Sequence, residues 1–158
     1  MHFISSMTIH PGKGTYALLL LAEQEVRVDV GRLGQLSGHP GHYVYIGSAF
    51  GPGGVAARLR HHFSVAARPH WHIDYLRRHT RLRAVWYTLD PVKREHLWAE
   101  AILKLPGAEI PLRGFGATDC NCPSHLMYFQ SAPSFQALRA SLVSIASGEA
   151  RIFRCHFP

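Results

Sequence analysis

The chain has 158 residues, 47% of them apolar, which is enough for one globular domain with a buried core. Its longest apolar run, residues 17–22, is too short to span a bilayer, and its first residues lack the pattern of a secretory signal. We therefore expect no membrane partner. Because three cysteines are an odd number, we also expect no disulfide framework and a reducing, cytoplasmic location.

The charge of the chain is strongly positive and comes mainly from arginine. The formal net charge is +7, and 14 of the 17 basic residues are arginine. Arginine binds phosphate through two parallel hydrogen bonds, so this composition favours a nucleic-acid partner. The same arginine content could instead reflect genome composition.

The first half of the chain predicts strands followed by a helix. Residues 15–21 are a strand candidate, and residues 26–30 alternate apolar with polar side chains, as a second strand hairpinned to the first does. Residues 31–41 are rich in glycine and predict a loop before a third strand at 43–47. A glycine-rich turn then leads into a helix at 55–66.

The second half mixes helices with one further strand. We expect a short helix from Trp71 to about His79, a strand at 82–89, and helices at 90–105 and from Pro133 to before Gly148. Asp90 followed by proline predicts the helix start at 90. The order predicts an α+β domain at 13–158, with a small, largely antiparallel sheet flanked by helices, after a leader at 1–12.

The predicted helix at 55–66 places two candidate catalytic side chains together. Arg58 and His62 are four residues apart at the edge of its apolar stripe, whereas Arg60 and His61 point away from it. This edge meets the sheet where Tyr16 could emerge. The alternative is an ordinary exposed basic face.

The helix at 90–105 carries a carboxylate on its predicted apolar face. Glu95 falls between Val92 and Ala99 on the side that faces the core, and Glu100 lies nearer the margin. A core-facing carboxylate is costly unless it is paired or binds a cation. Glu95 therefore needs an arginine or a metal ion.

These residues occur in the order of a known nuclease family. Gly14-Thr15-Tyr16, Tyr45-Ile46-Gly47, Arg58 with His62, and a later helical glutamate resemble the GIY-YIG endonuclease superfamily. The resemblance to its Uri-type branch extends through residues 70–76, Glu95-x-x-Trp98-Ala99, residues 114–122 and Ser124-His-Leu126. The first motif has threonine where the superfamily has isoleucine, and both are β-branched.

The resemblance implies a metal-dependent endonuclease that hydrolyses phosphodiester bonds in DNA. Tyr16 would help to activate water, Tyr45 would orient water or phosphate, and Arg58 would neutralise charge developing on phosphorus. His62 would assist proton transfer, and Glu95, with Glu100 as the alternative, would hold Mg²⁺ or Mn²⁺. The ten acidic residues include no D-x-D or D-x-E cluster, which favours one metal ion over two.

A second group of residues could bind a different metal. Cys120, Cys122 and His125 are of the types that bind zinc, and His70 or His72 could supply a fourth ligand. The C-x-C spacing is tighter than the usual one, so the alternative is a rigid loop with small buried thiols.

The segment from His70 to Tyr75 has two interpretations. Asp74 could accept a hydrogen bond from a histidine at the start of a helix, or the segment could form an edge that contacts DNA. The predicted contacts with DNA are Lys13, Ser48, Arg60, Trp71, His72, Tyr75, Arg77 and Arg78.

The sequence therefore predicts a cytoplasmic, metal-dependent DNA endonuclease. Two other classes of function stay open. One is a nucleic-acid-binding module whose site no longer cuts, and the other is a zinc-stabilised structural or interaction protein.

Overall fold

The computed structural model of the chain describes residue 9 and residues 11–145 and 151–158. Within them, two antiparallel sheets and four helices form a single α+β domain, which confirms the predicted fold class. None of the described helices is long and apolar enough to cross a bilayer. Most of the predicted leader, residues 1–8 and 10, lies outside the described residues, while Ile9 is buried in the core.

The main sheet has β1 at its centre. Its strand order is β6-β4-β1-β5-β7, and every neighbouring pair is antiparallel. The predicted strands at 15–21, 43–47 and 82–89 are confirmed with small changes at their ends. The two outer strands were not predicted, since each has only four residues. The five strands are β1 (Gly14–Ala22), β4 (Gly41–Ala49), β5 (Arg81–Tyr87), β6 (Leu126–Phe129) and β7 (Phe153–His156).

The strand at Val26–Val30, β2, does not pair with β1 as predicted. It pairs with β3 (Gly34–Gly38), a strand inside the segment predicted to be a loop, and the two form a separate sheet. The reason is that β4 and β5 already occupy both edges of β1.

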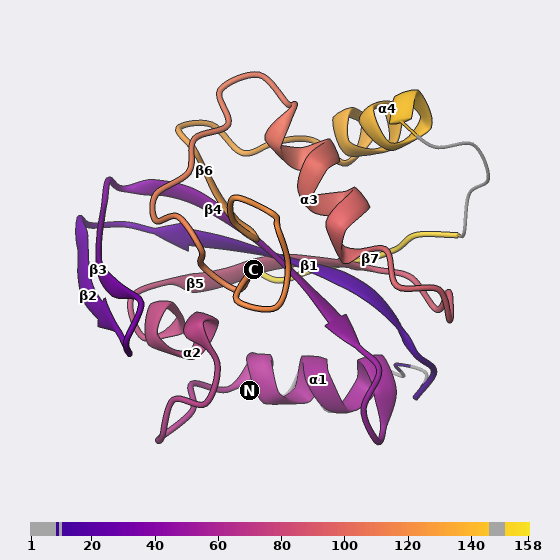
Figure 1. Ribbon diagram of the computed structural model, residues 1–158, viewed down its shortest axis with the longest axis horizontal. Coiled ribbons are helices and arrows are strands. Elements are labelled where there is room, and N and C mark those ends of the chain that lie inside the picture. The colour runs from indigo at the N-terminus through magenta and orange to yellow at the C-terminus, as the bar shows by residue number, and fades with distance from the viewer. Residues whose placement is uncertain (1–8, 10, 146–150) are drawn as a thin grey trace.

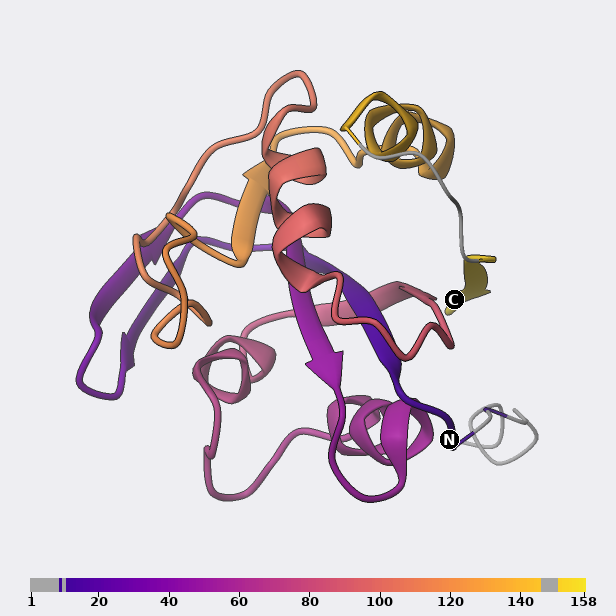
Figure 2. The same cartoon turned by 45° about the vertical axis from the view of Figure 1, so that its right-hand side comes forward.

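The helices cover the main sheet on both faces (Figures 1 and 2). Helices α1 (Gly54–Phe63) and α2 (His72–Arg77) pack on one face together with Tyr16, Leu18 and Tyr45. Helices α3 (Glu95–Leu103) and α4 (Phe135–Ile145) pack on the other face against Ala17, Ile46 and Trp86. The alternation of side chains along β1 therefore supplies two separate cores.

The spacing of Phe135, Leu138, Leu142 and Ile145 predicts the buried face of the last helix, and the three members whose side chains the structure describes do pack on the core. Leu138 is fully buried, and Phe135 and Leu142 pack partly buried against the same core. The side chain of Ile145, the fourth predicted member, lies outside the described residues.

The start of α3 differs from the prediction. The helix begins at Glu95 rather than Asp90, and Val92 is an exposed residue that precedes it. Asp90 accepts hydrogen bonds from the Val92 amide and from the Arg94 side chain, so it closes a local turn instead of capping a helix. Glu95 thus lies in the first turn of α3, on the same side as the buried Ala99 and Ile102, whereas Val92, the other predicted neighbour on that face, lies before the helix.

We predict that Gly14→Ala will destabilise the fold. A Cβ at this position would lie 1.9 Å from the Thr88 carbonyl oxygen, in the backbone of the segment after β5, which cannot move without breaking its bonds to β1. The expected loss of unfolding free energy, measured by urea denaturation, is about 2 kcal/mol or more. Gly51→Ala is the control, because a Cβ there meets nothing within 4 Å. Equal stability of the two variants would contradict the prediction.

Candidate functional site

Two tyrosines lie on the same face of the central strands. In the β1–β4 register Tyr16 is opposite Gly47, and Tyr45 is opposite Leu18, so the two phenols are diagonal neighbours. Their ring centroids are 6.4 Å apart. A Cβ on Gly47 would lie 2.5 Å from the Tyr16 ring, so only glycine at this position leaves room for the phenol.

His62 joins the pair from α1. Its Nε2 lies 2.8 Å from the Tyr16 hydroxyl, and its side chain is fully buried. Its Nδ1 is buried without a hydrogen-bond partner among the described residues. The predicted pairing of an imidazole with the first tyrosine motif is therefore present in the fold, on the helix edge that the sequence indicated.

Arg58, one helical turn before His62, lies beside both phenols. Its guanidinium carbon is 4.1 Å from the centroid of the Trp71 ring, and it is close enough to Tyr16 for a hydrogen bond. Within the described part of the chain Arg58 forms no ion pair, so an aromatic face, and not a carboxylate, holds it in place. Such a guanidinium is available to an anion.

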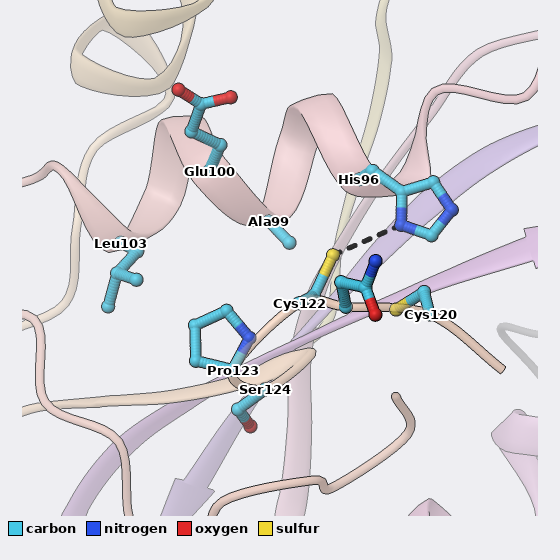
Figure 3. Close-up of a pocket in the computed structure, with 9 residues that line it drawn as sticks. His96, Ala99, Glu100, Leu103, Cys120, Cys122, Pro123 and Ser124 are labelled. Atoms are coloured by element: carbon cyan, nitrogen blue, oxygen red, sulfur yellow. Dashed lines mark hydrogen bonds between the residues drawn. The ribbon is translucent and has the colours of Figure 1, made fainter. Parts of the chain in front are cut away.

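Glu95 reaches the same site from the first turn of α3. The amide of the preceding residue, Arg94, donates a hydrogen bond of 3.1 Å to the Thr15 hydroxyl, next to Tyr16 in β1. The Glu95 side chain is 18% exposed. Glu100 is 55% exposed and pairs with Lys104 at 3.1 Å. In Figure 3 it points away from the loop at residues 114–125, called here the cysteine loop, which carries Cys120 and Cys122. Of the two carboxylates, only Glu95 lies at the site.

The electrostatics of the site keep its aromatic groups neutral. Burial, with the neighbouring Tyr45, raises the pKa of Tyr16, and Arg58 opposes this effect. Burial also raises the pKa of Tyr45, and Glu95 adds to the rise in both phenols. Burial and the neighbouring His61 lower the pKa of His62 to about 3. At neutral pH the two phenols and the His62 imidazole are therefore uncharged.

Asp74 organises the start of α2. It accepts a hydrogen bond of 2.8 Å from His61 Nε2 and two more from the His70 and Trp71 amides. Asp74 therefore caps the start of α2 as predicted, but the histidine side chain that it binds is His61, from the last turn of α1, and His70 contributes only its backbone amide. Three ligand-type atoms of Asp74, His61 and His62 cluster here. Because His61 Nε2 and Asp74 already bond to each other, and His62 Nε2 bonds to Tyr16, we do not assign a metal to this group.

Only some of the residues predicted to contact DNA lie at the surface. Lys13, Arg60 and Arg78 are exposed, and Ser48 is half-buried. Arg77 is buried and donates hydrogen bonds to the carbonyls of His62 and Thr80, so its predicted place on the basic surface was wrong. Arg77 therefore satisfies one carbonyl group in the last turn of α1 and one just after α2.

The aromatic members of that set contact the protein itself. Trp71 lies against Arg58, and His72 Nδ1 accepts a hydrogen bond of 2.9 Å from the Gly116 amide. The Tyr75 ring packs against Gly31 in the turn between β2 and β3. These contacts hold the walls of the site together.

The cysteine loop forms a second cluster on the α3 side of the site. Ligand-type atoms of Cys120, Cys122, His125 and His96 all lie within 4.8 Å of one another. Figure 3 shows His96 on α3 facing Cys122 across an open hollow. The proposed fourth ligands His70 and His72 were wrong, since His72 binds Gly116 instead. In the sequence, the only sign that His96 could be a ligand was its position next to Glu95.

We predict that His62 makes stability fall on acidification. An unfolded histidine has a pKa of about 6.5, whereas His62 in the fold has a pKa of about 3. Between these values the unfolded state binds a proton that the folded state does not. The contribution of His62 to the free energy of unfolding is therefore retained above pH 6.5 and lost as the pH falls toward 3. Between pH 7 and 4.5 the free energy of unfolding, measured with urea, should decline less steeply in His62→Gln than in the unmodified protein, by up to about 1.4 kcal/mol per pH unit.

The control for this measurement is His156→Gln, which changes an exposed histidine and should keep the slope of the unmodified protein. Burial lowers the pKa of His42, His72 and His125 as well, so these histidines add to the pH dependence of every variant. The effect of His62 is therefore the difference in slope between the variants. An unchanged slope in His62→Gln would refute the assignment.

Comparison with known proteins gives one match. A family described as a domain of unknown function, DUF123, matches residues 15–147, which include the tyrosine pair, α1, the start of α3 and the cysteine loop. No curated protein and no solved structure matches the chain. Since the match spans most of the sequence, the chain belongs to the DUF123 family.

Proposed function

We propose that this protein is a metal-dependent endonuclease of the GIY-YIG type, from the Uri-type branch, that hydrolyses DNA. One observation carries the proposal: Arg58 has no ion-pair partner in the described structure, lies over the Trp71 ring, and acts electrostatically on Tyr16, Tyr45 and His62. The ordered tyrosine motifs and the arginine-rich composition support it.

Binding of the phosphate depends on Arg58 in this proposal. A phosphodiester beside the guanidinium would gain charge-assisted hydrogen bonds, which strengthen as negative charge grows on phosphorus. The stacking of Arg58 on Trp71 reduces its freedom before substrate arrives, so less entropy is lost on binding. Trp71 thus serves as a positioning residue.

The carboxylate of Glu95 fits a single divalent cation. It is partly exposed and close enough to raise the pKa of both phenols, and carboxylate oxygen is the ligand that Mg²⁺ and Mn²⁺ prefer. A cation bound there supplies Lewis-acid stabilisation to the scissile phosphate and the leaving oxygen.

Proton transfer follows the contact between Tyr16 and His62. Water attacking phosphorus gives its proton to the Tyr16 oxygen, while the Tyr16 hydroxyl proton passes to His62 Nε2, 2.8 Å away. An incoming phosphate favours this step, because an anion nearby raises the pKa of an imidazole. The P–O bond to the leaving oxygen then breaks.

The burial of the phenols favours a second candidate, a module that binds nucleic acid without cutting it. Tyr16 is 1% exposed and Tyr45 8% exposed, so substrate meets Arg58 before it reaches the Tyr16 hydroxyl. This candidate predicts salt-sensitive DNA binding without metal-dependent cleavage.

Cleavage assays on branched, structured and single-stranded DNA with Mn²⁺ separate the two candidates. We expect cleavage by the unmodified protein and losses of about 100-fold or more in Tyr16→Phe and Glu95→Gln. Tyr43→Phe and Glu100→Gln are matched controls: the Tyr43 hydroxyl bonds to the His39 carbonyl, and Glu100 pairs with Lys104. Equal cutting by all four variants, or binding without any cutting, would overturn the proposal.

Thr15 offers a separate test of how Glu95 is positioned. Thr15→Val keeps the side-chain shape but removes the acceptor for the Arg94 amide at the start of α3. We expect a several-fold rise in the Mn²⁺ concentration that gives half-maximal cleavage, with DNA affinity unchanged. Thr80→Val, which removes a hydroxyl bonded to the Leu76 carbonyl, is the control. Identical Mn²⁺ dependence in the two variants would show that Thr15 does not position Glu95.

A further inference from the structure

We infer that His96, Cys120, Cys122 and His125 form a zinc site next to the candidate catalytic site. Two thiolates and two imidazoles are the ligand set of tetrahedral zinc, and their four ligand-type atoms lie within 4.8 Å of one another. The site is distinct from the Mg²⁺ or Mn²⁺ position proposed at Glu95, because its donors are sulfur and nitrogen.

The distances within the cluster match the edges of a zinc tetrahedron. With Zn–S near 2.3 Å and Zn–N near 2.0 Å, sulfur and nitrogen ligands lie about 3.5 Å apart. His96 Nδ1 is 3.1 Å from Cys122 Sγ, and Cys120 Sγ is 3.4 Å from His125 Nε2. Each histidine therefore faces one thiol through one ring nitrogen.

The other ring nitrogens face the carboxylate of Glu95. His96 Nε2 is 3.8 Å from one Glu95 oxygen, and His125 Nδ1 is 3.9 Å from the other. Zinc-bound histidines commonly direct their free N–H toward a carboxylate, which fixes the orientation of the ring and increases its basicity. Glu95 lies where such a carboxylate would be for both histidines.

The loop that carries the cysteines holds its shape through its own contacts. The Gly114 amide bonds to the Pro123 carbonyl at 2.8 Å, and the His125 amide bonds to the Phe115 carbonyl at 2.8 Å. Phe115 itself is fully buried. The ligands are thus held close together before any metal binds.

A route from solution leads to the cluster. His96 is 52% exposed, and an open hollow lined by His96, Cys120 and Cys122 gives access from the surface (Figure 3). Zinc bound there would join the cysteine loop to the first turn of α3 and so restrain Glu95. The site is therefore structural, with an effect on the neighbouring carboxylate.

Metal analysis of the tag-free, full-length protein tests this inference. We expect one zinc per chain, and we expect Co²⁺ substituted for zinc to show the absorption bands of tetrahedral thiolate coordination. Affinity for zinc, measured against a competing chelator, should fall more than 10-fold in His96→Ala and in Cys122→Ser. Glu95→Gln should still bind zinc, with an affinity 10- to 100-fold lower.

Matched controls lie elsewhere in the fold. Cys155→Ser changes the third cysteine, in β7, and His156→Ala changes an exposed histidine, so both should bind zinc as the unmodified protein does. Because His96 is half-exposed, its truncation leaves the core intact. No stoichiometric binding of zinc or Co²⁺, or unchanged affinity in His96→Ala, would overturn the inference. The measurement is independent of DNA cleavage, so its failure would leave the proposed nuclease untouched.

Discussion

The close approach of the Tyr16 ring to Gly47 is the constraint on which the site depends. The ring lies across the neighbouring strand where a Cβ would be 2.5 Å away, and the β1–β4 register sets this pairing. A shift of one residue would turn Tyr16 to the opposite face, away from α1. The hydrogen bond to His62, the contact with Arg58 and the position beside Tyr45 all follow from this one register.

Glu95 connects the two halves of the site. One anchor is the bond from the Arg94 amide to the Thr15 hydroxyl, which fixes the first turn of α3 to the central strand. The other is the pair of histidines, His96 and His125, that face its two oxygens. Threonine in the first tyrosine motif thus has a use that an aliphatic residue could not serve, because only a hydroxyl accepts that amide.

Local patterns in the sequence were enough to predict the fold class, the long strands and the helix edge that carries Arg58 and His62. They failed where a partner distant in the sequence decides the outcome. The start of α3 depends on Thr15, 79 residues before Arg94, and His96 meets Cys122 from 26 residues away. Arg77 gave the pattern of a surface charge, yet buried carbonyls bind it. The helical phase that relates Glu95 to Ala99 and Ile102 is present in α3, and only the predicted extension of that face to Val92 is absent.

The charges of the site link metal binding to the acidity of the phenols. Burial raises the pKa of both tyrosines, Arg58 lowers them, and Glu95 raises them further. A cation bound to Glu95 would cancel that last effect and bring the phenols closer to ionisation, whereas a phosphate beside Arg58 would act in the opposite sense. The same anion would also raise the pKa of the His62 imidazole, which makes that group more basic. In the proposed mechanism, a substrate phosphate would therefore favour a proton on His62, and a cation at Glu95 would favour loss of the proton from Tyr16, across the 2.8 Å contact between them.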